Sequence, residues 1–327
     1  MKILVTGGTG FIGSALVKAL VREGHAVRSL DDQSRGRPYR LADVANDVEM
    51  FDGDVRDAAK VSQAVKGVDA VHHLACINGT ETFYSKPQLV LDVAVRGMLN
   101  VLDACVEHGV GDLLFMSSSE VYQTPARVPT DEKAGFSIPD PLNPRYSYAG
   151  GKLISELLAI NYGRGAAFNR VTIVRPHNVY GPDMGREHVI PQFALRMREL
   201  GTTGPVPFPI QGDGSETRAF VYIDDFIDGT MRVVERGEHL GIYHVGTQEE
   251  VPISAIAHLV ARALGRTITL VPGPLQKGGT PRRCPDITKL SALGYAPKWA
   301  LADGIRVTAK WYDENAGGPP QATLREV

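Results

Sequence analysis

The 327-residue sequence has few cysteines, no long apolar run and no basic cluster. Its three cysteines, Cys76, Cys105 and Cys284, are scattered without metal-ligand spacing, so we expect reduced thiols and no metal site. No segment reaches the roughly 20 apolar residues of a membrane span, which predicts that the chain does not enter a membrane. The net charge of −2 and the lack of a stacked aromatic pattern argue against nucleic acid as a partner.

The rest of the composition is typical of a globular protein. Hydrophobic residues make up 43% of the chain and charged residues 22%, which is enough to bury a substantial core. The length predicts one large domain or two associated domains. Because the first predicted strand begins at residue 2, no space remains for a signal peptide before it, and we expect a cytoplasmic protein.

A glycine-rich turn follows the first apolar segment. Residues 2–6 are mostly apolar, Gly7, Gly10 and Gly13 follow, and residues 14–23 have helical apolar spacing. Glycines in this position let a pyrophosphate approach the backbone amides, and the helix N-terminus supplies N–H donors and a partial positive charge. The pattern predicts a dinucleotide site, although it also occurs as a plain turn between a strand and a helix.

An acid, Asp31, ends the second predicted strand, residues 26–30. A carboxylate there can accept hydrogen bonds from the ribose hydroxyls of an adenosine and repels a 2′-phosphate, which favours NAD over NADP. Arg35 and Arg37 keep NADP open as an alternative, because an arginine can hold that phosphate. The other interpretation of Asp31 is a solvated loop acid.

Strand-like and helical segments alternate through the first half of the chain. Further strands are predicted at residues 48–51, 69–74, 112–116 and 170–174, and helices at residues 57–66, 88–108 and 148–162. The strands are nearly continuous apolar runs, as is typical of strands buried on both faces. The alternation predicts an α/β fold with a doubly wound, parallel, Rossmann-like sheet and right-handed crossovers.

The composition of the sequence changes after residue 176, where proline and glycine become frequent and the predicted helices become shorter. We predict a mainly NAD-binding domain at 1–176, a smaller substrate-binding lobe at 177–315 and a mobile tail at 316–327. Strands near residues 219–223 and 241–245 could still rejoin the main sheet. Ligands of such folds bind outside the strand C-termini, so we expect the reaction in the cleft between the two parts.

A tyrosine and a lysine four residues apart form the sharpest chemical signal. Tyr148 and Lys152 share one face of a predicted helix, close enough for the ammonium to act on the phenol. A phenol ordinarily titrates near pH 10, so it needs a nearby positive charge to serve as a base at neutral pH. The serines at 117–119 follow the strand 112–116, where a hydroxyl opens into the cleft. Each motif alone is also compatible with a surface pair or a turn.

Together, these motifs resemble the extended short-chain dehydrogenases/reductases of the NAD-dependent nucleotide-sugar epimerase/dehydratase family, from residue 1 to about residue 312. The matching segments are residues 6–13, 52–55, 73–75, 117–122, 175–182, 212–218 and 285–287, with Asn100, Tyr148 and Lys152. The set is specific for the family and much less specific for the reaction.

The resemblance implies an NAD site at the carboxyl ends of the strands. Asp54 and Val55 would edge the adenine, and residues 74–76 would line the dinucleotide. The implied cofactor-binding residues are Gly7, Gly10, Phe11, Ile12, Gly13, Asp31, Asp54, Val55, Leu74, Ala75, Cys76, Tyr148, Lys152 and Pro176.

It also implies a nucleotide-sugar substrate and a catalytic set, Ser118, Tyr148, Lys152 and Glu120. Tyr148 would take a proton from a sugar hydroxyl as a hydride leaves the same carbon for NAD. Lys152 would hold the nicotinamide ribose and lower the pKa of the tyrosine. Asn178 and Arg218 would bind the substrate diphosphate, and a loop that includes Val189 would contact the base. The implied substrate-binding residues are Ser118, Ser119, Asn178, Val189, Arg218 and Arg283.

Three reactions can follow oxidation at the sugar C4. Dehydratases of this kind usually carry an Asp-Glu pair where this chain has Ser119 and Glu120, so dehydration is the least favoured. Similar UDP-glucuronate decarboxylases carry the Ser-Glu pair and an arginine at the position of Arg283, but they differ at residues 76–84. We favour a C4 epimerase, with decarboxylation as the alternative.

A non-catalytic dinucleotide-binding protein is a further alternative. Such relatives tend to lose the tyrosine or the lysine, whereas this chain keeps Ser118, Tyr148 and Lys152, which argues for an enzyme. Similar proteins pair the helices that correspond to residues 88–108 and 148–162 across a two-fold axis. We therefore expect a homodimer.

Overall fold

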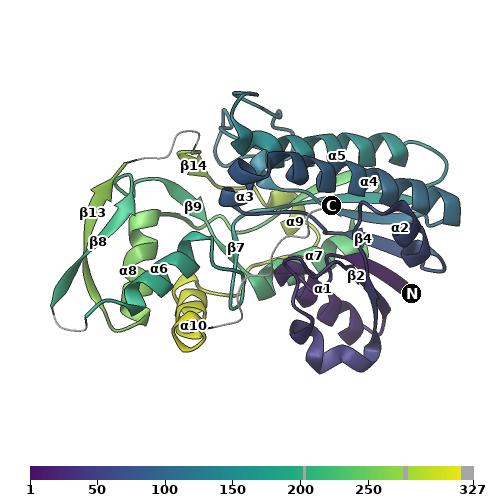
Figure 1. The fold of residues 1–327 in the computed structure, drawn as a ribbon. Helices are drawn as coiled ribbons and strands as arrows, with labels where there is room; N and C mark the ends of the chain where they lie inside the picture. Colours follow the sequence, from purple (N-terminus) through teal and green to yellow (C-terminus); the bar gives the residue numbers. More distant parts are fainter. Residues whose placement is uncertain (202–203, 275–278, 318–327) are drawn as a thin grey trace.

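The computed structural model describes residues 1–201, 204–274 and 279–317, so most of the predicted tail lies outside the described residues. A larger α/β part and a smaller lobe lie side by side (Figure 1). The larger part contains nearly all of the first half of the chain, and the lobe is built mainly from the second half.

Seven parallel strands form the central sheet, in the order β11-β6-β5-β4-β1-β2-β3. The strands are β1 (Lys2–Thr6), β2 (Ala26–Asp31), β3 (Val48–Asp52), β4 (Ala70–His73), β5 (Asp112–Met116), β6 (Arg170–Pro176) and β11 (Gly241–Val245). The predicted doubly wound parallel sheet is confirmed. The strand order reverses between β1 and β4, and such a switch point is where ligands bind in open α/β sheets.

Helices cover both faces of this sheet. One face carries α2 (Ala58–Val65), α4 (Pro87–His108) and α5 (Ser147–Gly163), and the other carries α1 (Phe11–Arg22) and α7 (Ile223–Arg236), as Figure 1 shows. Strand β1 explains the continuous apolar runs, because Ile3 and Val5 belong to the core beneath α1 while Leu4 belongs to the core beneath α4. A strand buried on both faces is therefore mostly apolar along its whole length.

Two of the predicted boundaries shift in ways that affect the site. The first helix, expected at residues 14–23, begins at Phe11, so its first turn follows Gly10 directly. The second strand extends to Asp31 and includes it. Of the two late strands, 241–245 joins the main sheet as β11. The segment 219–223 does not, because its residues divide between small sheets and the start of α7.

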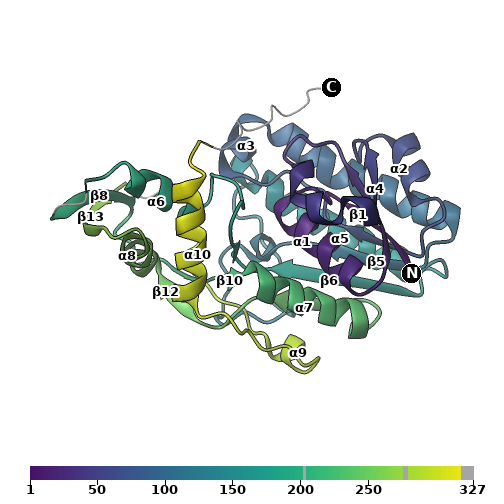
Figure 2. The ribbon, with the colours of Figure 1, turned by 90° about the horizontal axis from the view of Figure 1, so that it is seen from below.

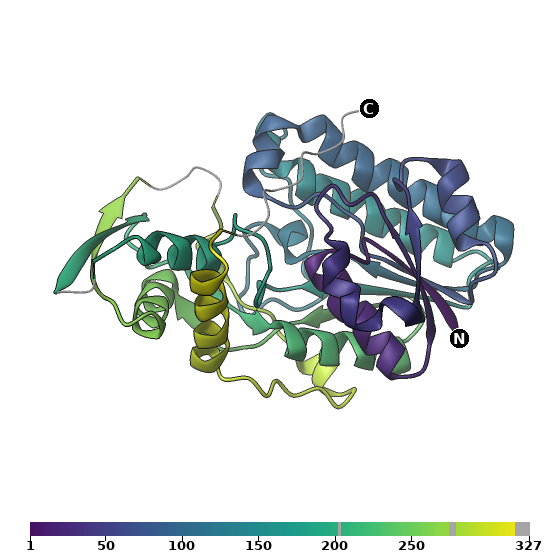
Figure 3. The same ribbon diagram turned by 60° about the horizontal axis from the view of Figure 1, so that its bottom comes forward.

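In the described part of the chain, the smaller lobe contains three helices and three small sheets. Its elements are β7 (Val179–Tyr180), α6 (Val189–Arg198), β8 (Pro205–Gln211), β9 (Thr217–Ala219), β10 (Val221–Tyr222), β12 (Glu250–Pro252), α8 (Ile253–Ala263), β13 (Thr267–Gly273), β14 (Arg282–Arg283) and α10 (Leu301–Glu314). Short elements elsewhere are η1 (Pro38–Asp47), α3 (Thr80–Ser85), η2 (Ser119–Tyr122), η3 (Pro144–Tyr146) and α9 (Thr288–Ser291). Figures 2 and 3 show α10 at the junction of the lobe and the larger part. None of the helices in the described ranges is long and apolar enough to cross a membrane.

Candidate active site

The glycine turn after β1 leaves backbone donors free at the start of α1. Gly7 has a φ of +72°, and a Cβ there would lie 3.0 Å from the backbone of Ala75. A Cβ on Gly13 would lie 2.0 Å from the Gly7 carbonyl oxygen, so a side chain is excluded at both positions. No side chain caps the first turn of α1. Its N–H groups and the helix dipole therefore suit a pyrophosphate.

The Asp31 carboxylate lies beside this turn at the end of β2. It accepts hydrogen bonds from the backbone N–H of Thr9 at 2.9 Å and of Gln33 at 2.8 Å. Burial raises the pKa of Asp31, and these hydrogen bonds oppose the rise. The two arginines that kept NADP open both have protein partners. Arg35 donates to the Asn78 carbonyl, and Arg37 donates to the Gly36 carbonyl at 2.9 Å.

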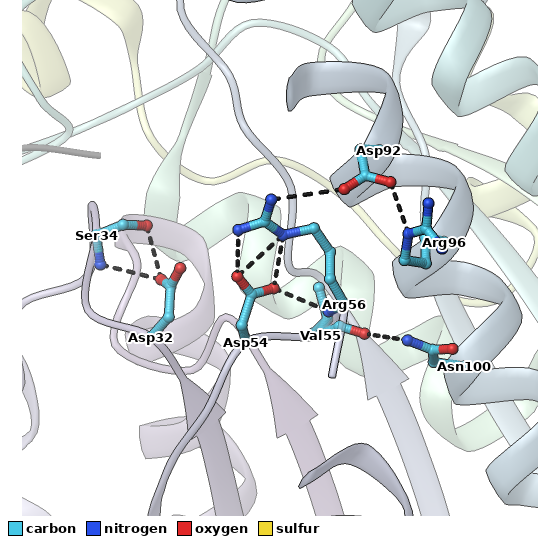
Figure 4. Close-up of polar contacts among 8 residues, drawn as sticks. All are labelled: Asp32, Ser34, Asp54, Val55, Arg56, Asp92, Arg96 and Asn100. Atoms are coloured by element: carbon cyan, nitrogen blue, oxygen red, sulfur yellow. Dashed lines mark hydrogen bonds and ion pairs between the residues drawn. The ribbon is translucent and has the colours of Figure 1, made fainter. Parts of the chain in front are cut away.

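The loop after β3 is tied to α4 by a chain of polar contacts (Figure 4). Arg56 pairs with Asp54 at 2.6 Å and with Asp92 of α4 at 3.5 Å. The Asn100 side chain donates to the Val55 carbonyl at 2.9 Å. These contacts hold the predicted adenine edge against the helix. Asn100, one of the residues on which the family resemblance is based, thus contacts this loop.

One cavity of about 370 Å³ runs over the carboxyl ends of these strands from Asp31 to Arg283. It brings together every predicted cofactor-binding and catalytic residue and most of the predicted substrate-binding residues. Those lining it are Gly7, Gly10, Phe11, Ile12, Gly13, Asp31, Asp54, Val55, Leu74, Ala75, Cys76, Ser118, Ser119, Glu120, Tyr148, Lys152, Pro176, Asn178 and Arg283.

Two predicted substrate-binding residues, Val189 and Arg218, do not line this cavity. Val189 starts α6 and packs against the apolar core, whereas the preceding residue, His188, lines the cavity. Arg218 donates to the carbonyls of Thr217 and Pro281 at 2.7 and 3.3 Å. Nothing in the sequence distinguished His188 from Val189, because only the start of the helix decides which of them faces inward.

The catalytic candidates meet in the middle of the cavity. Tyr148 lies in the first turn of α5 and is buried, as is Lys152 one turn later. The Lys152 Nζ donates to the Met116 carbonyl at 2.7 Å and lies 5.9 Å from the centre of the Tyr148 ring. Met116 ends β5, and Ser118 follows it at the cavity wall. The helix spacing and the strand end thus place all three side chains together.

The pKa of Tyr148 is raised well above its ordinary value, chiefly by burial and then by the neighbouring Cys76 thiol. The hydrogen bond with the Ser118 hydroxyl acts in the opposite direction and lowers this pKa. Burial therefore outweighs the lowering that we expected from Lys152. A base at this position needs a further positive charge beside it, and oxidised NAD carries one on its nicotinamide ring.

An ion pair closes the far end of the cavity. The Arg283 guanidinium donates to the Glu120 carboxylate at 2.6 Å and to the Thr280 hydroxyl at 3.0 Å. Burial alone would raise the pKa of Glu120, but the Arg283 charge and hydrogen bond hold it below its usual value. Burial and, after it, the charge of the nearby Arg283 lower the pKa of Arg218 to about 10.

Comparisons with known proteins identify the family. The profile of the NAD dependent epimerase/dehydratase family matches residues 3–246. A UDP-glucuronic acid decarboxylase from Arabidopsis thaliana is 33% identical over 97% of this chain and 70% of its own length. A dTDP-glucose 4,6-dehydratase double mutant from Streptomyces venezuelae, solved with NAD, is 31% identical and superposes with a TM-score of 0.85, covering 97% of this chain and 98% of that one.

A third relative catalyses another reaction. A UDP-glucose 4-epimerase from Thermotoga maritima, solved with UDP-glucose, is 26% identical with a TM-score of 0.85, covering 97% of this chain and 100% of that one. The similarities therefore extend across decarboxylases, dehydratases and epimerases and select none of them. The predicted family and the predicted cofactor, NAD, are both confirmed. This chain belongs to the NAD dependent epimerase/dehydratase family.

Proposed function

We propose that this chain is a nucleotide-sugar C4 epimerase that works through a transient 4-keto sugar. The observation that carries the proposal is the meeting of Ser118, Tyr148 and Lys152 in one cavity, between a dinucleotide cradle and the Arg283–Glu120 pair. NAD bound in the cradle would supply a reversible hydride acceptor for the sugar C4 carbon. Epimerisation needs no other acid or base, because the second half-reaction reverses the first on the opposite face of the sugar.

Each residue of this group has a defined task. The Tyr148 phenolate accepts the proton of the C4 hydroxyl, and the Ser118 hydroxyl, which already contacts the phenol, orients the same sugar oxygen. Lys152 holds its ammonium beside the ring and, in the proposed complex, contacts the nicotinamide ribose. Arg283 and Asn178 face the cavity at the diphosphate end, where charged hydrogen bonds to phosphate are strong.

The residues beside Ser118 argue against dehydration. Loss of water from the sugar needs a general acid, and Ser119 stands where dehydratases carry an aspartate. Glu120 cannot replace that acid, because Arg283 holds its pKa below the ordinary value and keeps the carboxylate ionised. The site therefore offers oxidation and reduction at C4 without a proton donor for the leaving hydroxyl.

Decarboxylation of a nucleotide-linked uronic acid is the second candidate, and the Arg283–Glu120 pair favours it. A guanidinium at this end could hold a C6 carboxylate, which the 4-keto group would labilise. Similar decarboxylases, however, differ from this chain at residues 76–84, and this difference ranks epimerisation first.

The decisive experiment incubates the purified protein and NAD with UDP-glucose, UDP-glucuronate and their GDP, CDP and dTDP counterparts. Mass spectrometry and NMR then identify the products. We expect an unchanged mass with inverted stereochemistry at C4. Loss of carbon dioxide from a uronic acid would replace the proposal by decarboxylation, and loss of water would replace it by dehydration.

Tyr148→Phe is the matched control for this experiment, because it removes only the phenolic oxygen. We expect NAD to bind as before and turnover to fall at least about a hundredfold, the scale of a lost general base. Full activity in this variant would refute the role of Tyr148. A protein that binds NAD but converts no sugar nucleotide in the panel, even transiently, would support the non-catalytic alternative.

We also propose that the enzyme is a homodimer that pairs α4 and α5 with their copies. Four large apolar residues are exposed on these helices, Leu91 and Val106 on α4 and Ile154 and Leu157 on α5. Burying such side chains against a second copy supplies the driving force for association. Light scattering of the intact protein tests this: Leu157→Glu should shift the mass towards the monomer, and a wild-type monomer would contradict the proposal.

A further inference from the structure

A buried ion pair lies directly behind the catalytic residues and has no part in the proposed chemistry. Arg175 of β6 and Glu156 of α5 meet in a two-pronged contact, with Nε to Oε1 at 2.9 Å and Nη2 to Oε2 at 2.5 Å. Their side chains are 1% and 0% exposed. Both charges are therefore fully removed from water.

The pair has further partners on other elements. The Ser117 hydroxyl donates to Oε1 of Glu156, and Nη1 of Arg175 donates to the Tyr122 hydroxyl and, at 3.2 Å, to the Glu132 carbonyl. The guanidinium carbon also lies 4.9 Å from the centre of the Tyr122 ring. Each acceptor and donor of the pair is thus fixed by a specific neighbour.

Stability alone does not account for such a pair. Transferring two charges out of water costs free energy that their attraction only partly recovers, and apolar side chains of similar size usually serve as well. A fully desolvated pair with a complete set of hydrogen bonds does, however, fix the relative position of the elements that carry it. The pair can therefore affect the reaction only through the side chains that those elements carry.

Through Ser117, the pair ties α5, which carries Tyr148 and Lys152, to the end of β5, which Ser118 follows. Glu156 lies one helical turn after Lys152 on α5. Ser117 lies between Met116, whose carbonyl accepts from Lys152 at 2.7 Å, and Ser118, which lines the same cavity as Tyr148. The Ser117–Glu156 hydrogen bond and the Lys152–Met116 hydrogen bond are therefore two parallel ties between the end of β5 and α5.

We propose that Glu156, Arg175 and Ser117 are positioning residues that hold Ser118 against Tyr148 at the geometry the reaction needs. The proposal rests on the proposed function. Arg175 fixes the Glu156 carboxylate from β6, and Glu156 fixes the end of β5 through Ser117. Displacements of about 1 Å in such a group can cost up to about a hundredfold in rate.

Ser117→Ala tests the proposal, because it removes one tie and leaves the ion pair in place. We expect kcat to fall between about ten- and a hundredfold with KM unchanged. The acid limb of the kcat/KM profile, which reports ionisation of Tyr148, should move to higher pH, because the Ser118 hydrogen bond that lowers the pKa of Tyr148 is loosened.

Ser155→Ala is the matched control. Ser155 is the neighbour of Glu156 on α5, is equally buried, and donates to the carbonyls of Ala94 and Gly151 at 3.0 and 2.8 Å. It points towards α4 and has no tie to β5, so its loss should leave kcat and the pH profile unchanged. Wild-type kinetics in Ser117→Ala, or an equal loss in both variants, would overturn the proposal.

The outcome is separable from failure of the proposed function. If the wild-type protein converts no sugar nucleotide, the ultraviolet titration of Tyr148 in the NAD complex replaces the kinetic readout. It is obtained as the difference between each variant and the same variant carrying Tyr148→Phe. A higher pKa of Tyr148 in Ser117→Ala than in Ser155→Ala supports positioning, and equal values overturn it.

Discussion

Two arginine–glutamate pairs of the same chemistry lie in different surroundings in this protein. The inner pair, Arg175–Glu156, is 1% and 0% exposed and joins two nitrogens to two oxygens. The outer pair, Arg283–Glu120, is 10% and 24% exposed and joins one nitrogen to one oxygen at 2.6 Å. Every guanidinium nitrogen and carboxylate oxygen of the inner pair has a partner among the described residues, whereas the outer pair lies on the cavity wall.

The neighbours of the two pairs sharpen this contrast. The inner arginine lies beside two aromatic rings, and its last nitrogen is occupied by a tyrosine hydroxyl. The outer arginine has a buried Nε without a partner among the described residues, and further arginines nearby lower the pKa of Glu120. An arginine and a glutamate thus fix the packing of α5 on β6 at the inner pair and form a candidate ligand site at the outer pair.

The largest effect should separate the pairs by stability. We expect Arg175→Ala to lower the free energy of unfolding by about 3–5 kcal/mol, because it leaves Glu156 buried and charged without its partner. Arg283→Ala should cost less than about 1 kcal/mol, since Glu120 can turn towards the cavity. Chemical denaturation of both variants checks this. Equal losses would mean that the contrast in burial has no energetic consequence.

The contrast between the two pairs could not be predicted from the sequence. The strand, glycine turn and helix at residues 2–23 and the spacing of Tyr148 and Lys152 follow from local patterns, so most of the cavity lining could be predicted. Glu156, in contrast, is an acid on a helix and looks like part of a solvated face, and the predicted strand 170–174 stopped one residue before Arg175. Only the packing of α5 on β5 and β6 buries the two charges together.

The next largest effect should be on substrate binding, because only the outer pair lines the cavity. We expect Arg283→Ala to raise KM about ten- to a hundredfold with little change in kcat if the enzyme is an epimerase, because a charged hydrogen bond to phosphate contributes about 1.5–3 kcal/mol in both ground and transition states. A fall in kcat at unchanged KM would instead indicate decarboxylation. Unchanged kinetics would place Arg283 outside the substrate site.

A smaller effect, for each pH unit, comes from His244, which lies next to the inner pair through Tyr122. His244 hydrogen-bonds to Tyr122 at 2.6 Å, and burial lowers the pKa of His244 from 6.5 to about 3. Between those values the unfolded chain binds a proton that the folded chain does not, so stability falls as the pH falls below 6.5. His244→Gln should reduce this slope by about 1.4 kcal/mol per pH unit. An unchanged slope in urea titrations between these pH values would exclude His244 as its source.

The smallest effect should come from the outer acid. The pKa of Glu120 is depressed below its ordinary value of 4.5, so its contribution to stability is present above that pH and is lost as the pH falls through the lower folded value. Glu120→Gln should therefore be less stable than the wild type at neutral pH by less than about 1 kcal/mol, because the pair is partly solvated, and the difference should shrink as the pH falls below 4.5. A loss of unfolding free energy as large as that of Arg175→Ala would show that the outer pair is also rigidly held in place. It would then be unable to exchange Glu120 for a substrate phosphate, and the distinction between the two pairs would no longer hold.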